Sequence, residues 1–206
     1  MYKGQGQRCG QLAFCQHQGW DVKGYQSADH PAQQAMLSMF TELAEEPIDV
    51  IGVDGCTLPA PRLSLTGFAR ALAKIAAPDL LHGTMSVAAE QIMSTTMQFP
   101  YLTGGSKSPN SIMTAASSKK FFAKNGAEGV YAVILPEARA AMALKITDGS
   151  MRAADVAIAG MLLQMAEHLN LDKDMLNKFT TEDMYNSANV KVGACRYANI
   201  LPLLKS

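Results

Sequence analysis

The sequence reads Val130-Tyr-Ala-Val-Ile-Leu135, Pro136-Glu-Ala-Arg139 and Ala141-Met-Ala-Leu-Lys-Ile146 in its second half, and these residues decide the fold class. The first and third runs are rich in apolar residues that fit a pleated, half-buried surface. The proline and the polar residues between them are typical of a turn. Two such runs joined by a short turn predict an antiparallel hairpin.

Helices are expected on both sides of this hairpin. Apolar residues recur at helical spacing in six segments: residues 11–17, 29–45, 64–75, 86–97, 151–168 and 172–178. Asp29 and Ser150 are the expected N-caps of the second and fifth helices. In the fourth helix, three side chains are the expected core residues: Val87, Ile92 and Met93.

Few other strands are expected. Residues 48–53 predict a buried strand, residues 189–197 predict a last strand, and residues 99–118 predict a loop-rich segment. Dominant helices, with a few strands grouped toward the end, indicate an α+β fold in which helices pack on a small antiparallel sheet. The length of 206 residues suits a single domain that covers residues 1–206.

The composition indicates a folded protein without a strongly charged surface. Hydrophobic residues make up 48% of the chain and charged residues 17%, which allows a buried core. The 18 basic and 18 acidic side chains give a formal net charge of zero, so neither nucleic acid nor a membrane is an expected partner. No apolar run is long enough to span a bilayer, and residues 1–6 lack the apolar stretch of a signal peptide, so a cytoplasmic location is expected.

Asp54 and Cys56 follow the end of the strand predicted over residues 48–53. Both side chains can face one cleft, where a thiolate would act as a nucleophile or as a metal ligand. The alternative is a tight turn with an incidental cysteine. The other cysteines form no C-x-x-C pair and are expected to be free thiols: Cys9, Cys15 and Cys195.

Four more side chains have both a functional and a structural interpretation. Lys124, before the hairpin, either projects into a cleft at the sheet edge or is a solvated loop residue. Glu128 stands between two glycines, where the backbone must bend tightly or approach another segment closely, and it either binds an amine or caps backbone amides. His30, before Pro31, is either a functional imidazole or a first-turn residue bonded to the backbone. Lys145 either reaches a cleft or a counter-charge from a buried face, or is solvated on an edge strand.

Four motifs resemble the asparaginase II family, in the family's order. They are Gly19-Trp-Asp-Val-Lys-Gly-Tyr25 with His30-Pro-Ala-Gln33, Gly52-Val-Asp-Gly-Cys-Thr-Leu-Pro59, Ala123-Lys-Asn-Gly-Ala-Glu-Gly-Val-Tyr-Ala-Val133, and Ala143-Leu-Lys-Ile-Thr-Asp-Gly149 with Arg152-Ala153. The resemblance runs from about Gly4 to Val192. It implies a fold similar to that of serine β-lactamases and glutaminases, and hydrolysis of L-asparagine to L-aspartate and ammonia.

The resemblance also implies a site. In the family, serine–lysine pairs supply the nucleophile and its base, and a zinc site is held by cysteines and a lysine. Carried over residue by residue, Lys124 and Asp54 are the expected catalytic residues. Glu128 and His30 are the expected substrate-binding residues, and Cys56 matches a zinc ligand. A small amide is the expected ligand, and a homodimer or a complementing chain is the expected partner.

Two departures from the family pattern lower the expected activity. The family's CSGKH segment falls on residues 4–8, where Gly4 and Gln7 replace a zinc cysteine and the lysine ligand, so no cofactor is expected. The family's amino-terminal part, which carries the serine of an S-x-x-K motif, has no counterpart in these 206 residues, so a truncated relative is expected. The chain is therefore either an asparaginase-type amidohydrolase that is impaired by itself, or a non-catalytic relative that binds a ligand or a partner.

Overall fold

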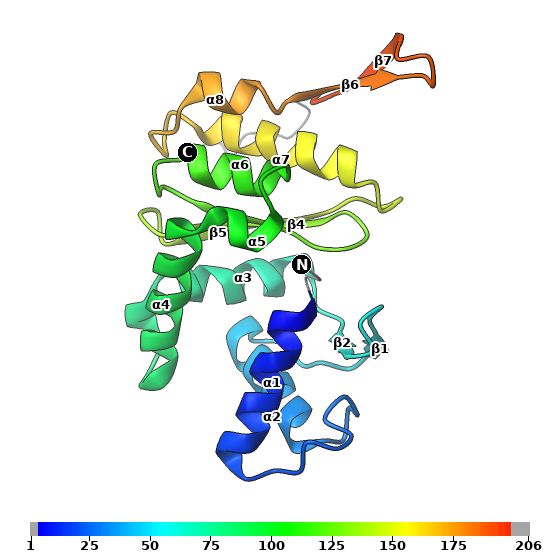
Figure 1. Cartoon of the computed structure of the whole chain (residues 1–206). Helices are drawn as coiled ribbons and strands as arrows, with labels where there is room; N and C mark the ends of the chain where they lie inside the picture. Colours follow the sequence, from blue (N-terminus) through cyan, green and yellow to red (C-terminus); the bar gives the residue numbers. More distant parts are fainter. Residues whose placement is uncertain (1–3, 199–206) are drawn as a thin grey trace. The chain divides into compact units, whose positions relative to one another are not determined.

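A computed structural model describes residues 4–198, which fall into two compact units that divide between Leu72 and Ala73. The described part contains helices and three small antiparallel sheets, which confirms the α+β class (Figure 1). The single domain over residues 1–206 stays a prediction. Within the described residues, no helix is long and apolar enough to cross a membrane.

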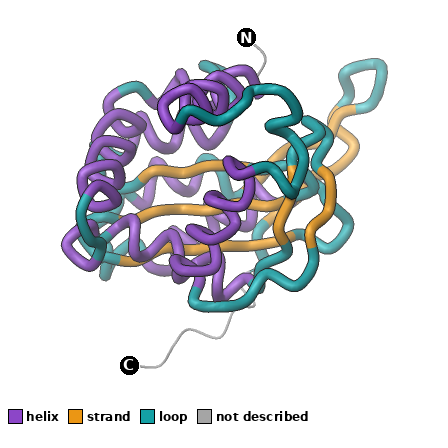
Figure 2. Tube along the Cα trace, turned by 90° about the horizontal axis from the view of Figure 1, so that it is seen from below, coloured by secondary structure: helices purple, strands orange, loops and turns teal. Residues whose placement is uncertain are grey.

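The second unit is built on the predicted hairpin. Strand β4 (Val130–Leu135) pairs antiparallel with β5 (Ala140–Lys145), with Val133 opposite Met142, so the hairpin is confirmed. A third strand that the sequence did not predict, β3 (Phe122–Asn125), pairs with the other side of β4. The order β3-β4-β5 leaves β3 and β5 at the two edges of the sheet, and Figure 2 shows the three strands side by side.

One face of this sheet packs on helix α7 (Met151–Met165), which lies along β4 and β5 in Figure 1. Ser150 caps α7 as predicted, because its hydroxyl accepts a hydrogen bond from the Ala153 N–H at 3.3 Å. The core between sheet and helix contains the fully buried side chains of Tyr131, Val133 and Ile158. Helix α8 (Lys173–Asn177) and the hairpin of β6 (Thr181–Tyr185) and β7 (Lys191–Arg196) follow α7. Strand β7 corresponds to the last strand predicted over residues 189–197. Its partner β6 was not predicted.

The segment over residues 99–118 is more helical than predicted. After the short helix η1 (Pro78–Leu80) and α4 (Thr84–Gln98), the chain forms α5 (Pro100–Gly104) and α6 (Pro109–Ala116). Both short helices begin with proline, which fits the first turn because that turn needs no amide donor. The loop-rich interpretation of residues 99–118 was wrong because these prolines start helices rather than end them.

The core residues expected in α4 are confirmed in part. Met93 is buried, with 4% of its surface exposed, whereas Val87 and Ile92 are 65% and 52% exposed. The prediction failed for these two because apolar periodicity marks a helix face without saying whether that face is covered.

The first unit begins with α1 (Gly4–Gln18) and α2 (Pro31–Ala44), and the buried Gln33 side chain joins them. Its amide nitrogen donates to Gln11 Oε1 at 3.1 Å and to the Tyr25 carbonyl at 2.7 Å. The N-cap of α2 is His30, whose ring accepts from the Ala32 N–H, so the prediction of Asp29 as the cap was wrong by one residue. Helix α3 (Leu65–Ala76) begins in this unit and ends in the second.

A small hairpin of β1 (Ile51–Val53) and β2 (Pro59–Pro61) carries the motif around Cys56. The strand predicted over residues 48–53 is shorter, and it is exposed rather than buried: Val53 has 79% of its surface exposed. Its apolar run indicated a core strand, but a two-stranded ribbon buries little by itself.

A carboxyl group lies against the core of the second unit. Asp155 on α7 lies near the fully buried hydroxyl of Tyr131, although no direct hydrogen bond of normal geometry joins the two. Burial raises the pKa of Asp155, the Tyr131 hydroxyl lowers it and the charge of Glu182 raises it, with a net value of about 6. Burial, followed by the charge of Asp155, also raises the pKa of Tyr131.

This environment predicts a pH-dependent stability. Asp155 binds its proton more tightly in the folded protein, with a pKa of about 6, than in the unfolded chain, where the pKa is about 3.9. Ionised Asp155 therefore destabilises the fold. The penalty is absent at pH 4 and below, grows up to about pH 6, and stays constant above that pH. Asp155→Asn should raise the free energy of unfolding at pH 7 by about 1–2 kcal/mol, allowing for the partial exposure of the group. Urea unfolding of both proteins at pH 4 and 7 measures this, and equal stability at pH 7 would contradict it.

Candidate functional site

Lys124 lies on the edge strand β3, opposite Ala132 of β4. Ala132 in turn lies opposite Ala143 of β5, so Lys124 is on the sheet face away from the Tyr131 and Val133 side chains that pack on α7. The side chain is half-buried, and its Nζ donates to the Asn125 carbonyl and lies 3.5 Å from Asn125 Oδ1. Lys124 is therefore a residue of an edge strand and not of a loop, and its projection into a cleft stays a prediction.

Lys145 is on the same face, on the other edge strand. It is exposed, and its Nζ donates to the Ile146 carbonyl. Of the two interpretations of this lysine, the structure favours the solvated residue of an edge strand.

Polar side chains of α6 and of its C-cap Ser117 cover the outer edge of β3 and of Phe121, which precedes it. Thr114 Oγ1 accepts from the Ala123 N–H at 3.0 Å, and Asn110 Nδ2 donates to the Ala123 carbonyl at 3.3 Å. Ser117 Oγ accepts from the Phe121 N–H at 3.4 Å. Sequence reasoning missed this arrangement, although the signal was present: the three polar residues recur at helical spacing of four and three, so they share one face of a helix.

Glu128 lies in the tight turn that joins β3 to β4. The Val130 N–H donates to the Ala127 carbonyl at 3.2 Å, and the two central residues have positive φ angles, 56° for Glu128 and 66° for Gly129. Such angles characterise a type I′ hairpin turn, where asparagine or glycine is usual and glutamate is not. The Glu128 carboxylate lies over Gly149, since a Cβ on that glycine would be 2.7 Å from Glu128 Oε2. The flanking glycines predicted a backbone that bends tightly or approaches another segment closely, and the structure shows a tight turn here.

Asp54 and Cys56 occupy the turn between β1 and β2, in the first unit. Cys56 Sγ donates to Asp54 Oδ2 at 3.1 Å, so the structure brings this carboxylate and this thiol together. The thiol hydrogen bond, assisted by the Gly55 N–H, lowers the pKa of Asp54 below its usual value. The guanidinium of Arg8 on α1 donates to the Cys56 carbonyl, which places the segment of residues 4–8 against this turn.

His30 uses both ring nitrogens on backbone groups. Nδ1 accepts from the Ala32 N–H at 3.2 Å, so Nε2 carries the proton and donates to the Asp21 carbonyl at 2.8 Å. Of the two interpretations of His30, this geometry favours the first-turn residue bonded to the backbone.

The predicted site residues thus form two groups. Asp54, Cys56 and His30 belong to the first unit, and Lys124 and Glu128 belong to one hairpin of the second. That Asp54, Cys56 and Lys124 face one cleft stays a prediction.

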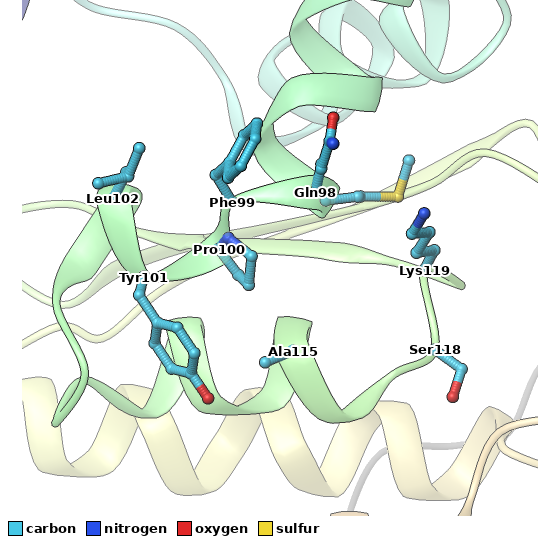
Figure 3. Close-up of a pocket in the computed structure, with 9 residues that line it drawn as sticks. Gln98, Phe99, Pro100, Tyr101, Leu102, Ala115, Ser118 and Lys119 are labelled. Atoms are coloured by element: carbon cyan, nitrogen blue, oxygen red, sulfur yellow. The ribbon is translucent and has the colours of Figure 1, made fainter.

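A separate cavity of about 580 Å³ lies in the second unit (Figure 3). It is bounded by the end of α4, by α5 and by the C-terminal part of α6, and most of its lining is apolar, with Phe99, Tyr101 and Leu102 prominent. None of the five predicted site residues lines it.

A comparison with protein families matches residues 5–197 to L-asparaginase II. The chain belongs to this family. Among curated proteins, no sequence matches the chain. Membership of the L-asparaginase II family agrees with the resemblance read from the four motifs, and it supports an asparaginase-like function at the level of the family.

The residues around Cys56 do not fit the zinc ion that the L-asparaginase II family implies. Cys56 Sγ donates a hydrogen bond to Asp54 Oδ2, whereas a zinc ligand is a thiolate with further ligands around the ion. Arg8, a fixed cation, lies against the same turn and would repel a second positive charge. Among residues 4–198, no group of three or more histidine, cysteine, aspartate or glutamate side chains is arranged to hold a metal.

Proposed function

We propose that this chain supplies the base-carrying part of an asparaginase-type amidohydrolase site, with L-asparagine as substrate and L-aspartate and ammonia as products. The proposal is supported by family membership, and the observation that carries it is the placement of Lys124. This lysine projects from an edge strand on the sheet face away from α7, and its ammonium group lies at the strand edge next to a close turn. A lysine in such a site acts as a base when its proton is removed.

The remaining roles follow from charge and position. The Glu128 carboxylate, exposed at the turn after β3, would bind the α-ammonium group of asparagine. For the oxyanion, the Gly126 N–H is not available, because it donates to the Val130 carbonyl at 2.8 Å. The nucleophile would come from a segment or a chain outside these 206 residues.

The reaction would divide its steps among these groups. An oxygen nucleophile attacks the side-chain amide carbon of asparagine while the neutral Lys124 amine takes its proton. The same proton then passes to the leaving nitrogen, which departs as ammonia, and water releases L-aspartate in a second attack.

A second candidate function is binding without catalysis. The apolar cavity beside α5 favours it, because Phe99, Tyr101 and Leu102 are 48%, 51% and 76% exposed and lie close together. Clustered exposed apolar side chains mark interaction sites more often than single ones do.

Calorimetric titration with L-asparagine and with L-aspartate tests the proposal and separates the two candidates. Lys124→Met and Glu128→Gln should each weaken binding, whereas Lys145→Met, on the same sheet face, should leave it unchanged. If Lys124→Met and Glu128→Gln leave binding unchanged but Tyr101→Ala abolishes it, the ligand binds in the apolar cavity. No binding of either amino acid would sink the asparaginase proposal.

We expect this chain to hold no stoichiometric zinc. One cysteine beside Arg8 offers too few ligands for a site that normally has four. Elemental analysis after dialysis should therefore find far less than one zinc per chain. The double variant Gly4→Cys/Gln7→Lys, which restores the family ligands, is the positive control. One tightly held zinc in the unchanged chain would contradict the expectation and would direct attention to Cys9 and His30 as ligands.

A further inference from the structure

We propose that Asn110 and Thr114 are positioning residues for Lys124, because they hold both backbone groups of Ala123, the residue before it, in a single place. The importance of this arrangement for catalysis rests on the proposed role of Lys124 as the base. The geometric argument itself depends on contacts between α6 and β3 and makes no use of the substrate.

The backbone around Lys124 is held from both sides. In an antiparallel ladder, successive residues of an edge strand direct their N–H and C=O groups alternately toward the partner strand and away from it. Lys124 pairs with Ala132 in the ladder, and the groups of Ala123 face away from it. Thr114 binds the outward N–H of Ala123, and Asn110 binds the outward carbonyl, which belongs to the peptide group shared with Lys124.

These two side chains are held rigidly themselves. Asn110 and Thr114 have 0% and 1% of their surface exposed. Ser108 donates to Asn110 Oδ1, which orients the amide so that its nitrogen points at Ala123. Gly104 at the end of α5 closes the remaining space, since a Cβ there would lie 2.8 Å from Asn110 Oδ1 and 2.6 Å from Ser111 Oγ.

The outward-facing backbone groups of β3 also contact the Lys124 side chain. Asn125, two residues after Ala123, also directs its carbonyl outward, and this carbonyl accepts from Lys124 Nζ. The ammonium group is therefore bonded to the same strand edge that Asn110 and Thr114 hold two residues earlier, at Ala123. A displacement of about 1 Å in a catalytic group can cost about a hundredfold in rate, so a clamp on the preceding peptide is a direct way to fix the base.

The experiment measures the chemistry of Lys124 without any substrate. The purified chain is labelled with trace acetic anhydride over a range of pH, and mass spectrometry compares acetylation of Lys124 with that of Lys145 in the same molecule. Thr114→Val keeps the shape of the side chain and removes the acceptor for the Ala123 N–H. It should change the Lys124 to Lys145 ratio by about threefold or more, since lysine reactivity follows its local environment. Thr114→Ser keeps the hydroxyl and should restore the ratio.

Ser117→Ala is the matched control for a merely structural effect. Ser117 also caps β3, but at Phe121, three residues before Lys124, so its loss should lower the melting temperature and leave the ratio unchanged. An unchanged ratio in folded Thr114→Val, or an equal change in Ser117→Ala, would overturn the proposal. If Thr114→Val does not fold, Asn110→Ser removes the contact with the Ala123 carbonyl, together with the Ser108 bond, and should give the same change of about threefold.

Failure of this proposal and failure of the proposed function give different results. If the labelling ratio is unchanged and L-asparagine still binds, the positioning role of Asn110 and Thr114 is rejected and the asparaginase proposal stands. If the ratio changes and L-asparagine does not bind, the positioning role is supported, but it has no connection to this substrate.

Discussion

Purified chain of these 206 residues will release ammonia from L-asparagine at a rate close to the uncatalysed background. Amide hydrolysis needs a nucleophile, a base that activates it, and donors for the developing oxyanion. Lys124 is the proposed base, and no serine in the sequence matches a nucleophile of the family. Loss of a nucleophile costs about 10⁴-fold or more in rate, and the remaining acceleration comes from binding and electrostatics alone.

A coupled assay for ammonia, with a complete L-asparaginase as reference, measures this rate. Lys124→Ala should change little, because a base without a nucleophile has no proton to remove. Robust turnover that Lys124→Ala abolishes would show that a nucleophile is present in the chain. Cys56→Ala would then be the first variant to examine, because Cys56 is the thiol beside Asp54.

Gly129→Ala should lower the free energy of unfolding by about 3 kcal/mol. This loss should be larger than for a methyl group added at any other position of the second unit's hairpin. Gly129 has a φ angle of 66°, which side chains with a Cβ adopt at a cost. The new Cβ would also lie 2.8 Å from Ile146 Cβ and 3.1 Å from the Gly149 carbonyl carbon. Neither the strand end nor the second turn can move without disturbing the ladder, because the Ile146 N–H donates to the Gly129 carbonyl at 3.0 Å.

Gly126→Ala provides the matched control at the other end of the same turn. Its Cβ would approach Val130 Cβ at 3.3 Å, and its backbone is outside the left-handed region. The control should therefore cost clearly less than Gly129→Ala. Urea unfolding measures the loss of free energy of unfolding in both variants. Equal losses would show that the left-handed backbone at Gly129 adds nothing to the cost of the substitution.

The fold was predictable where local signals and tertiary contacts agree. The β4–β5 hairpin and the Ser150 cap follow from short-range chemistry, and both are present. Strand β3 could not be predicted, because Phe122–Asn125 is short and becomes a strand only through its pairing with β4. The exposure of Val87 and Ile92 on α4 was also out of reach, because helical periodicity carries no information about which face is covered.

The site was predictable at the level of motifs and not at the level of contacts. Glycines on both sides of Glu128 indicated a backbone that bends tightly or approaches another segment, and the positive φ of Glu128 agrees with tight bending. The hydrogen bond between Cys56 and Asp54 agrees with their separation by two residues. Asn110 and Thr114, in contrast, stand in a segment interpreted as a loop, so their contacts with Ala123 required knowledge of the helix and of the strand together.

The polar face of α6 also determines how molecules of this protein can associate. An open edge strand invites the strand of another molecule to continue the sheet, which leads to fibrous or amorphous aggregates. At β3 the outward groups of Phe121 and Ala123 already have partners inside the same molecule. A foreign strand could join at this edge only after α6 had detached. Conditions that melt this eight-residue helix before the rest of the unit should therefore be the ones under which the protein begins to precipitate.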